Sequence, residues 1–195
     1  AHYFSEAADA AAENLAFERA AQLVDRALTL GNWSEYETAK LRQQLGDMYA
    51  ALGRSEQAAT AYFQAADASS DLDVRECRIL AVEQKLRSGD IQAGTDLLYD
   101  ELEALTFSPS SNRALLLASS LFQRWQLGRR GFDFQPERLE NIDRRQRLLV
   151  EALTMATLMY GITDVQRGTY FHYHALPRAL ETGYPSRIAL LLCQQ

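Results

Sequence analysis

Proline, glycine, cysteine and long hydrophobic runs are all scarce in this chain, and each shortage excludes a class of protein. Four prolines and ten glycines in 195 residues are few enough to suit long helices. Two cysteines cannot form a disulfide framework; Cys77 and Cys193 lie in apolar helical patterns, and we expect both to be buried thiols of a cytoplasmic protein. No apolar run approaches the roughly 18 residues of a membrane span and no signal peptide opens the chain, so we expect no membrane partner.

Positive charge is also in short supply, and it is unevenly placed. The net charge of −6 and the isoelectric point near 5.1 argue against a general nucleic-acid binder. Residues 1–106 hold 19 acidic and 9 basic side chains, whereas residues 107–195 hold 7 acidic and 11 basic ones. This asymmetry indicates either electrostatic complementarity, within the molecule or with a partner, or ordinary solvated faces.

What the chain does have is apolar residues spaced by three and four, with few β-branched residues and no strict alternation. This pattern predicts an all-α fold without a sheet. Helices are expected near residues 2–12, 14–30, 34–52, 55–69, 73–88, 90–105, 111–128, 137–160, 164–182 and 185–195. The last segment, SRIALLLCQQ, ends in an apolar helical pattern without a capping glycine, and we interpret the chain as a piece truncated at its C-terminus.

One stretch matches a 34-residue helix-turn-helix repeat. With Ala39 as its first position, the residues that close the helix pair in a tetratricopeptide repeat are Leu45, Gly46, Tyr49, Ala58, Tyr62 and Ala65. The best repeat therefore covers 39–72, with weaker copies on either side. We predict tetratricopeptide-like repeats over 1–106, and a further helical-repeat region over 107–195 that continues an α-solenoid of antiparallel helix pairs.

Two longer segments resemble the helical-repeat region of large bacterial serine/threonine protein kinases that also carry an ATPase-like module. The first is AHYFSEAADAAAENLAFERAAQLVDRALTL; the second combines a D-x-x-R-G turn with a G-x-P-x-R-x-A helix, at Asp164, Arg167, Gly168, Gly183, Pro185, Arg187 and Ala189. The resemblance implies a cytoplasmic, multidomain parent, which could be a kinase, and assigns this piece no catalytic residue. Pro177 departs from an uninterrupted helix, so we expect a kink or a helix restart there.

A search for catalytic chemistry finds little. The sequence LGRRGF at 127–132 lacks the spacing and the preceding strand of a phosphate-binding loop. His172 and His174 are two residues apart, so on a helix they point in different directions and cannot share one metal ion. No serine or cysteine nucleophile motif occurs. We therefore expect no enzyme activity, no cofactor and no metal.

Two candidate surfaces remain. In tetratricopeptide arrays the first helix of each pair lines a groove, and the corresponding residues here are Lys40, Gln43, Asp47, Glu76 and Glu83. This acidic groove suits a basic or amphipathic helix. An arginine-rich region after residue 120 forms a second candidate, an anion or acidic-partner surface with Arg129, Arg130, Arg144 and Arg145. The simpler alternative is that these arginines pair with the acidic half of the chain.

The leading hypothesis is a non-catalytic scaffold that contacts a protein partner or another domain of the same chain. The alternative is a sensor that binds a small ligand between helices and regulates an attached catalytic domain. Aromatic residues of the second half are either core or the lining of such a pocket. They are Trp125, Phe132, Phe134, Tyr160, Tyr170 and Phe171.

Overall fold

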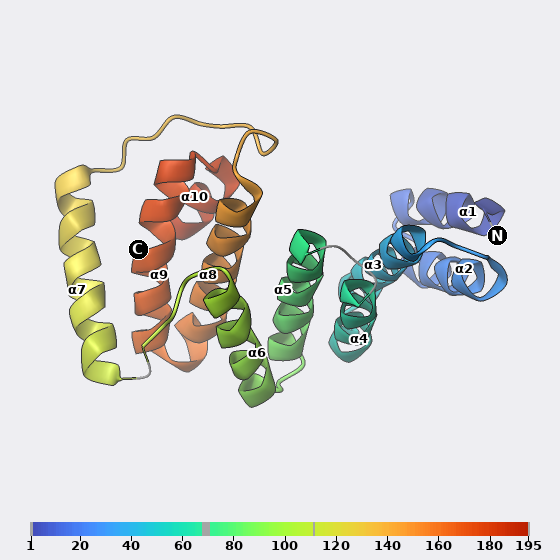
Figure 1. Cartoon of the computed structure of the whole chain (residues 1–195), viewed down its shortest axis with the longest axis horizontal. Helices are drawn as coiled ribbons and strands as arrows, with labels where there is room; N and C mark the ends of the chain where they lie inside the picture. The colour runs from blue at the N-terminus through green and yellow to red at the C-terminus, as the bar shows by residue number, and fades with distance from the viewer. Residues whose placement is uncertain (1, 68–70, 111, 195) are drawn as a thin grey trace. The chain divides into compact units, whose positions relative to one another are not determined.

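The computed structural model describes residues 2–67, 71–110 and 112–194, and within these ranges the chain is entirely α-helical (Figure 1). The all-α prediction is confirmed. The helices are α1 (His2–Glu13), α2 (Phe17–Leu30), α3 (Glu35–Ala51), α4 (Ser55–Ala66), α5 (Asp71–Arg87), α6 (Ile91–Ala104), α7 (Arg113–Arg130), α8 (Arg144–Thr163), α9 (Val165–Thr182) and α10 (Pro185–Leu192).

Capping side chains explain several of the helix starts. The Ser34 hydroxyl accepts from the Glu37 amide at 3.3 Å, while the Glu37 carboxylate accepts from the Ser34 amide at 2.9 Å, so a capping box begins α3. Asp164 accepts from the Arg167 amide at 3.2 Å and begins α9. These side chains satisfy amides that have no partner inside the helix.

Two sequence-based expectations about individual segments are wrong, and a third is narrowed. The helix expected from residue 137 begins only at Arg144, because Asp143 caps it and the preceding residues form a loop. Of the two outcomes expected at Pro177, a restart does not occur, because α9 is one continuous helix. Cys77 is buried as expected, but Cys193 is exposed because α10 ends at Leu192, one residue before it.

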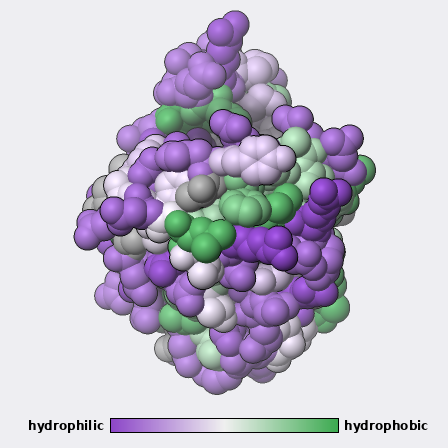
Figure 2. Space-filling model, turned by 90° about the vertical axis from the view of Figure 1, so that its right-hand side faces the viewer, coloured by the Kyte–Doolittle hydropathy of each residue, from purple (hydrophilic) through white to green (hydrophobic). Residues whose placement is uncertain are grey.

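The chain divides into two compact units, residues 1–97 and 98–195, with the division inside α6. In the first unit, each of α1 to α4 packs against the next helix along the chain. The core contains many alanines, among them Ala20, Ala27, Ala58 and Ala65, which have no exposed surface. Small side chains at these positions allow the helices to approach closely. The face of the molecule in Figure 2 is mostly hydrophilic, with hydrophobic side chains confined to small patches.

The residues of the predicted repeat register lie where α3 and α4 meet. Leu45, Gly46, Ala58, Tyr62 and Ala65 are buried. A Cβ atom on Gly46 would lie 2.6 Å from the Tyr62 ring, so only glycine leaves space for that ring. Gly46 therefore permits close contact between α3 and α4, while the assignment of this pair as a tetratricopeptide repeat stays a prediction.

The second unit is organised differently, around α9. Helices α7, α8 and α10 all pack against α9, so α7 packs on a helix that is not its neighbour in sequence (Figure 1). Phe171 of α9 is central: its ring lies 5.6 Å from the Tyr160 ring and 6.4 Å from the Tyr99 ring. The continuation of the tetratricopeptide-like array into residues 107–195 stays a prediction.

A loop of residues 131–143 connects α7 to α8 and is fixed to the end of α9. The Glu137 amide donates a hydrogen bond of 2.8 Å to the Gly183 carbonyl. Gly183 has a φ of +67°, and a Cβ atom there would lie 2.1 Å from the Gln135 carbonyl oxygen. Gly183 therefore permits both the end of α9 and the close approach of the loop.

We expect Gly183→Ala to destabilise the second unit, because the left-handed backbone costs a residue with a side chain about 1–2 kcal/mol and overpacking adds about 1–3 kcal/mol. Gly53→Ala is the matched control: Gly53 has a φ of +72° but a Cβ atom there meets nothing within 4 Å. Denaturant unfolding of both variants measures the difference. Equal losses of stability would show that the loop contact contributes nothing.

Candidate functional site

The residues predicted to line a groove lie on α3 and α5, and several of them contact other residues of the chain. Lys40 is exposed, with its ammonium 4.7 Å from the centre of the Tyr36 ring, and Gln43 is half-buried. Glu83 forms an ion pair of 2.8 Å with Arg87. Glu76 is half-buried and also takes part in an interaction within the chain.

Asp47 has the best-defined environment of this set. Its carboxylate accepts a hydrogen bond of 2.7 Å from the hydroxyl of Tyr62, which is 2% exposed. Burial raises the pKa of Asp47, although the hydrogen bond from Tyr62 acts in the opposite direction. Burial and the Asp47 carboxylate together raise the pKa of Tyr62. Asp47 therefore orients a core tyrosine, while Lys40 and Asp47 are the exposed members of this set on α3.

The raised pKa of Asp47 predicts a pH effect on stability. Because the folded state holds the Asp47 proton more tightly than the unfolded state, its contribution is fully present below the unfolded pKa and is lost as pH rises through the folded pKa. We expect Asp47→Asn to flatten the stability profile in that window, just above the usual range of aspartate. Urea unfolding across mildly acidic pH measures it; parallel profiles for both proteins would contradict the expectation.

The structure places the four predicted arginines in two groups. Arg129 and Arg130 end α7, whereas Arg144 and Arg145 begin α8, at the far end of the loop that Figure 1 shows crossing between them. Arg145 donates a hydrogen bond of 3.1 Å to the Ala104 carbonyl near the end of α6. Arg130 donates to the carbonyls of Gly131 and Asp133, both at 3.3 Å. Arg129 and Arg130 line a cavity.

The exposed side of α7 is a surface that sequence reasoning missed. Of the aromatic residues expected to be either core or pocket lining, Tyr160, Tyr170 and Phe171 are buried as core, whereas Trp125, Phe132 and Phe134 are exposed and Trp125 lines a cavity. We define the α7 stripe as five large apolar side chains that are each 52–58% exposed: Leu115, Leu117, Leu121, Phe122 and Trp125. α9 covers only the opposite side of α7, where Leu116, Ser120 and Leu127 are buried.

The stripe ends in an ordered arrangement of rings and charge. The Phe122 and Trp125 rings stack with centroids 6.0 Å apart and planes 28° apart. The Arg129 guanidinium lies 4.9 Å from the centre of the Trp125 ring. Apolar residues on several sides of a helix usually indicate that it is buried. The sequence of α7 therefore indicated an unusually apolar helix, but it did not indicate which side of the helix would be exposed.

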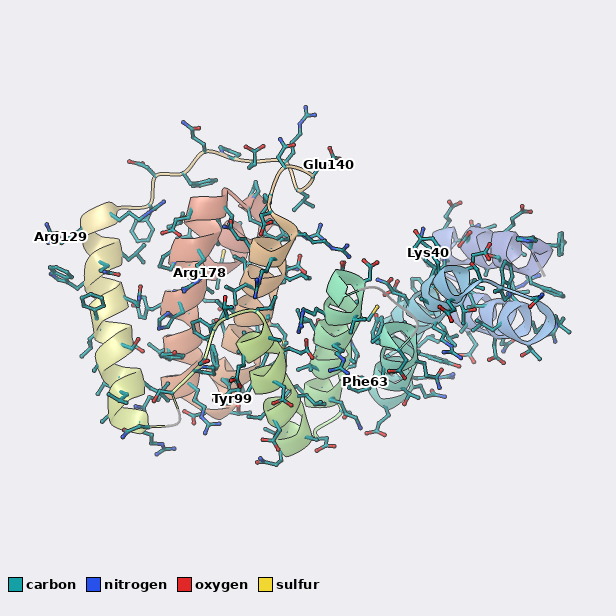
Figure 3. The ribbon with its side chains drawn as sticks, in the orientation of Figure 1. Lys40, Phe63, Tyr99, Arg129, Glu140 and Arg178 are labelled. Carbon is teal, nitrogen blue, oxygen red and sulfur yellow. The ribbon has the colours of Figure 1, made fainter. Side chains whose placement is uncertain are left out.

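A cavity of about 670 Å³ lies beside the stripe, between α7 and α9. Trp125, Arg129 and Arg130 line it from α7, and Arg178 and Glu181 line it from α9. Figure 3 shows Arg178 on the side of α9 that faces α7. Arg178 donates a hydrogen bond of 2.9 Å to the His174 carbonyl and lies over the Phe107 ring, and burial lowers its pKa. The cavity is therefore predominantly cationic.

A second cavity, of about 520 Å³, lies between α8 and α9. Its walls are mainly apolar, and the exposed side chains of Ile162 and Val165 are part of its lining. Close helix contact shapes it, because a Cβ atom on Gly168 would lie 2.8 Å from the backbone of Gly161. His172 also lines this cavity.

Both histidines of α9 are buried, and burial lowers the pKa of each, that of His174 to about 4. His174 Nε2 lies 2.9 Å from the Ser119 hydroxyl, whereas the ring nitrogens of His172 have no hydrogen-bond partner among the described residues. Within the same ranges, no group of three or more histidine, cysteine or acidic side chains is placed to hold a metal ion.

None of the helices in the described part of the chain is long and apolar enough to cross a membrane. Comparison with family models, with curated proteins and with solved structures found no match for this chain. The functional conclusion therefore depends on the surfaces of the molecule itself.

Proposed function

We propose that this chain is a non-catalytic helical-repeat scaffold that binds another protein or another domain, with the α7 stripe as its main contact surface. The observation that carries the proposal is the stripe itself, five large apolar side chains exposed along one helix. Contiguous exposed apolar patches are uncommon on monomeric proteins, and larger ones mark interaction sites. Tryptophan and arginine, which meet at the end of the stripe, are also the residues that most often dominate binding energy.

Site-specific photo-crosslinking tests this function. A photoreactive phenylalanine analogue at Leu121 is expected to capture a partner protein in cells, whereas the same analogue at Ser186, an exposed residue of α10, captures none. The exchange Trp125→Ser, introduced with the probe at Leu121, is expected to reduce capture strongly. Equal labelling from Leu121 and Ser186 would contradict the proposal.

We also propose that the parent protein is a cytoplasmic bacterial signalling protein that resembles serine/threonine kinases with an ATPase-like module. In support, the motif residues behind that resemblance have clear structural roles: Asp164 caps α9, Gly168 and Gly183 allow close contacts, and Pro185 occupies the first turn of α10. The coding sequence upstream of residue 1 tests this idea, since kinase motifs are expected there. The absence of kinase motifs there would contradict the proposed parent protein but would leave the scaffold proposal unaffected.

The cavity between α8 and α9 favours a second candidate function, binding of a small apolar ligand by a sensor. Its volume falls within the range of about 300–1,000 Å³ that ligand sites occupy. 1-Octanol serves as a probe, and the chain has only three histidines, so their ring signals are easily resolved by NMR. Binding is expected to shift the signal of His172 and leave that of His2 unchanged. No shift of the His172 signal would exclude this candidate.

A further inference from the structure

The charge of α7 restricts what its exposed side can bind. Its 18 residues include four arginines and no acidic residue. The arginines are Arg113, Arg124, Arg129 and Arg130, all exposed. Arg113 lies 3.9 Å from the Asp164 carboxylate, while Arg129 lies over Trp125 and Arg130 donates only to backbone carbonyls. The stripe is therefore apolar with a cationic margin, which is complementary to an apolar surface with an acidic margin.

The spacing within the stripe matches the recognition of a helix. Leu121 and Trp125 are four residues apart, and Phe122 and Trp125 are three apart, so the three side chains lie on one face of α7. An amphipathic helix presents its own anchors at the same spacings when it lies along such a surface.

Arg178 indicates which chemical group a partner must bring to the end of the stripe. Its guanidinium is half-buried; Glu181 of the same cavity attracts it, but no carboxylate within the described ranges forms an ion pair with it. The cavity that it lines opens beside Trp125 and Arg129, at the end of the stripe. A half-buried cation is stabilised when an anion joins it, so a carboxylate entering this cavity would complete the site.

Two other occupants fit these observations less well. A second copy of the chain pairing through α7 would bring arginines toward arginines, because α7 has no acidic residue to oppose them. An anionic membrane surface would be attracted by the arginines, but a flat surface lying on the exposed stripe would leave half-buried Arg178 in the cavity without an anion.

We propose that α7 docks an acidic amphipathic helix of a partner protein, whose apolar face covers the stripe and whose carboxylate enters the cavity to pair with Arg178. This inference rests on the proposed scaffold function and adds the chemistry of the partner. The expected complex combines buried aromatic anchors with a charge pair at the end of the interface.

The test uses the whole chain labelled with 5-fluorotryptophan, which gives one ¹⁹F signal for Trp125 and one for Trp33 in the other unit, as an internal control. The probes are three synthetic helices with the same leucine face and with glutamate, glutamine or lysine on the remaining positions. We expect the glutamate helix to shift the Trp125 signal alone, and to bind at least about tenfold more tightly than the other two at low salt. Its affinity should fall as salt rises.

Three variants define the site. Arg178→Gln should weaken binding of the glutamate helix about tenfold or more, because it removes one partner of a desolvated charge pair. Arg129→Gln, at an exposed residue whose exchange leaves the fold intact, should weaken it several-fold. Arg138→Gln, at an exposed loop arginine outside the cavity, is the matched control and should change binding less than about twofold. Circular dichroism checks that each variant is folded.

Several outcomes would overturn the inference. Equal binding of the three helices would contradict the proposal that the partner is acidic. If photo-crosslinking from Leu121 still captured a protein in that case, the proposed scaffold function would stand. Stronger binding to phosphatidylglycerol vesicles than to the glutamate helix would identify a membrane surface instead. A concentration-dependent dimer that Trp125→Ser abolishes would identify a second copy. If the folded Arg178→Gln variant bound the glutamate helix with unchanged affinity, the proposed charge pair with Arg178 would be contradicted.

Discussion

Phe171→Ala is expected to lower the free energy of unfolding of the second unit by about 3–5 kcal/mol, the usual cost of removing a core phenylalanine. Phe171 is 1% exposed, and its ring contacts those of Tyr99, Tyr160 and Tyr170. These aromatic neighbours come from α6, α8 and α9, so the cavity left by the ring cannot close through the shift of a single helix. Denaturant unfolding followed by circular dichroism measures the loss.

Phe132→Ala is the matched control for this prediction. Phe132 lies in the loop after α7 and is 46% exposed, so the same truncation should change the unfolding free energy by no more than about 0.5 kcal/mol. Phe171→Leu, which retains most of the buried volume, should fall between the two. A Phe171→Ala variant as stable as Phe132→Ala would show that the aromatic cluster is not the core of this unit.

Gly161 of α8 and Gly168 of α9 lie where these helices meet, and substitution by alanine is expected to change the free energy of unfolding in opposite directions at the two positions. A Cβ atom on Gly168 would lie 2.8 Å from the Cα and N atoms of Gly161, and backbone atoms cannot move aside as a flexible side chain can. Overpacking costs about 1–3 kcal/mol, and better helix propensity returns up to about 1 kcal/mol. We therefore expect a net loss of stability for Gly168→Ala and a larger loss for Gly168→Leu.

Gly161→Ala should instead stabilise the protein by up to about 1 kcal/mol, because Gly161 is exposed and a Cβ atom on it meets nothing within 4 Å. Thermal unfolding of the single variants compares the two positions directly. If both alanine variants were stabilised, the close backbone contact between α8 and α9 would not exist in solution. Loss of stability in both would indicate that the two positions are equally restricted.

Much of the fold was predictable because local chemistry determines it. The three- and four-residue spacing predicted the helices, and the Ser34 and Asp164 caps begin two of them. These features depend on residues close together in sequence.

The open side of α7 could not be predicted, because it depends on which helix covers α7. A run of three leucines at 115–117 places apolar residues on several faces, and the partner helix α9 begins only at Val165. The positions of the candidate arginines could not be predicted for the same reason. Arg129 and Arg145 were predicted to share one surface although they are 16 residues apart, and the loop of residues 131–143 separates the helices that carry them. Contacts over such sequence separations are decided by packing rather than by local pattern.

The packing of α7 on α9 also affects how the chain folds during synthesis. Each helix of the first unit can find its neighbour as soon as the next segment leaves the ribosome, since consecutive helices pack together. α7 has to wait until α9 has been made, and the whole of α8 is made in between. During that interval α9 does not yet cover the leucines and aromatic residues of α7, and exposed apolar side chains of this kind favour aggregation of a nascent chain.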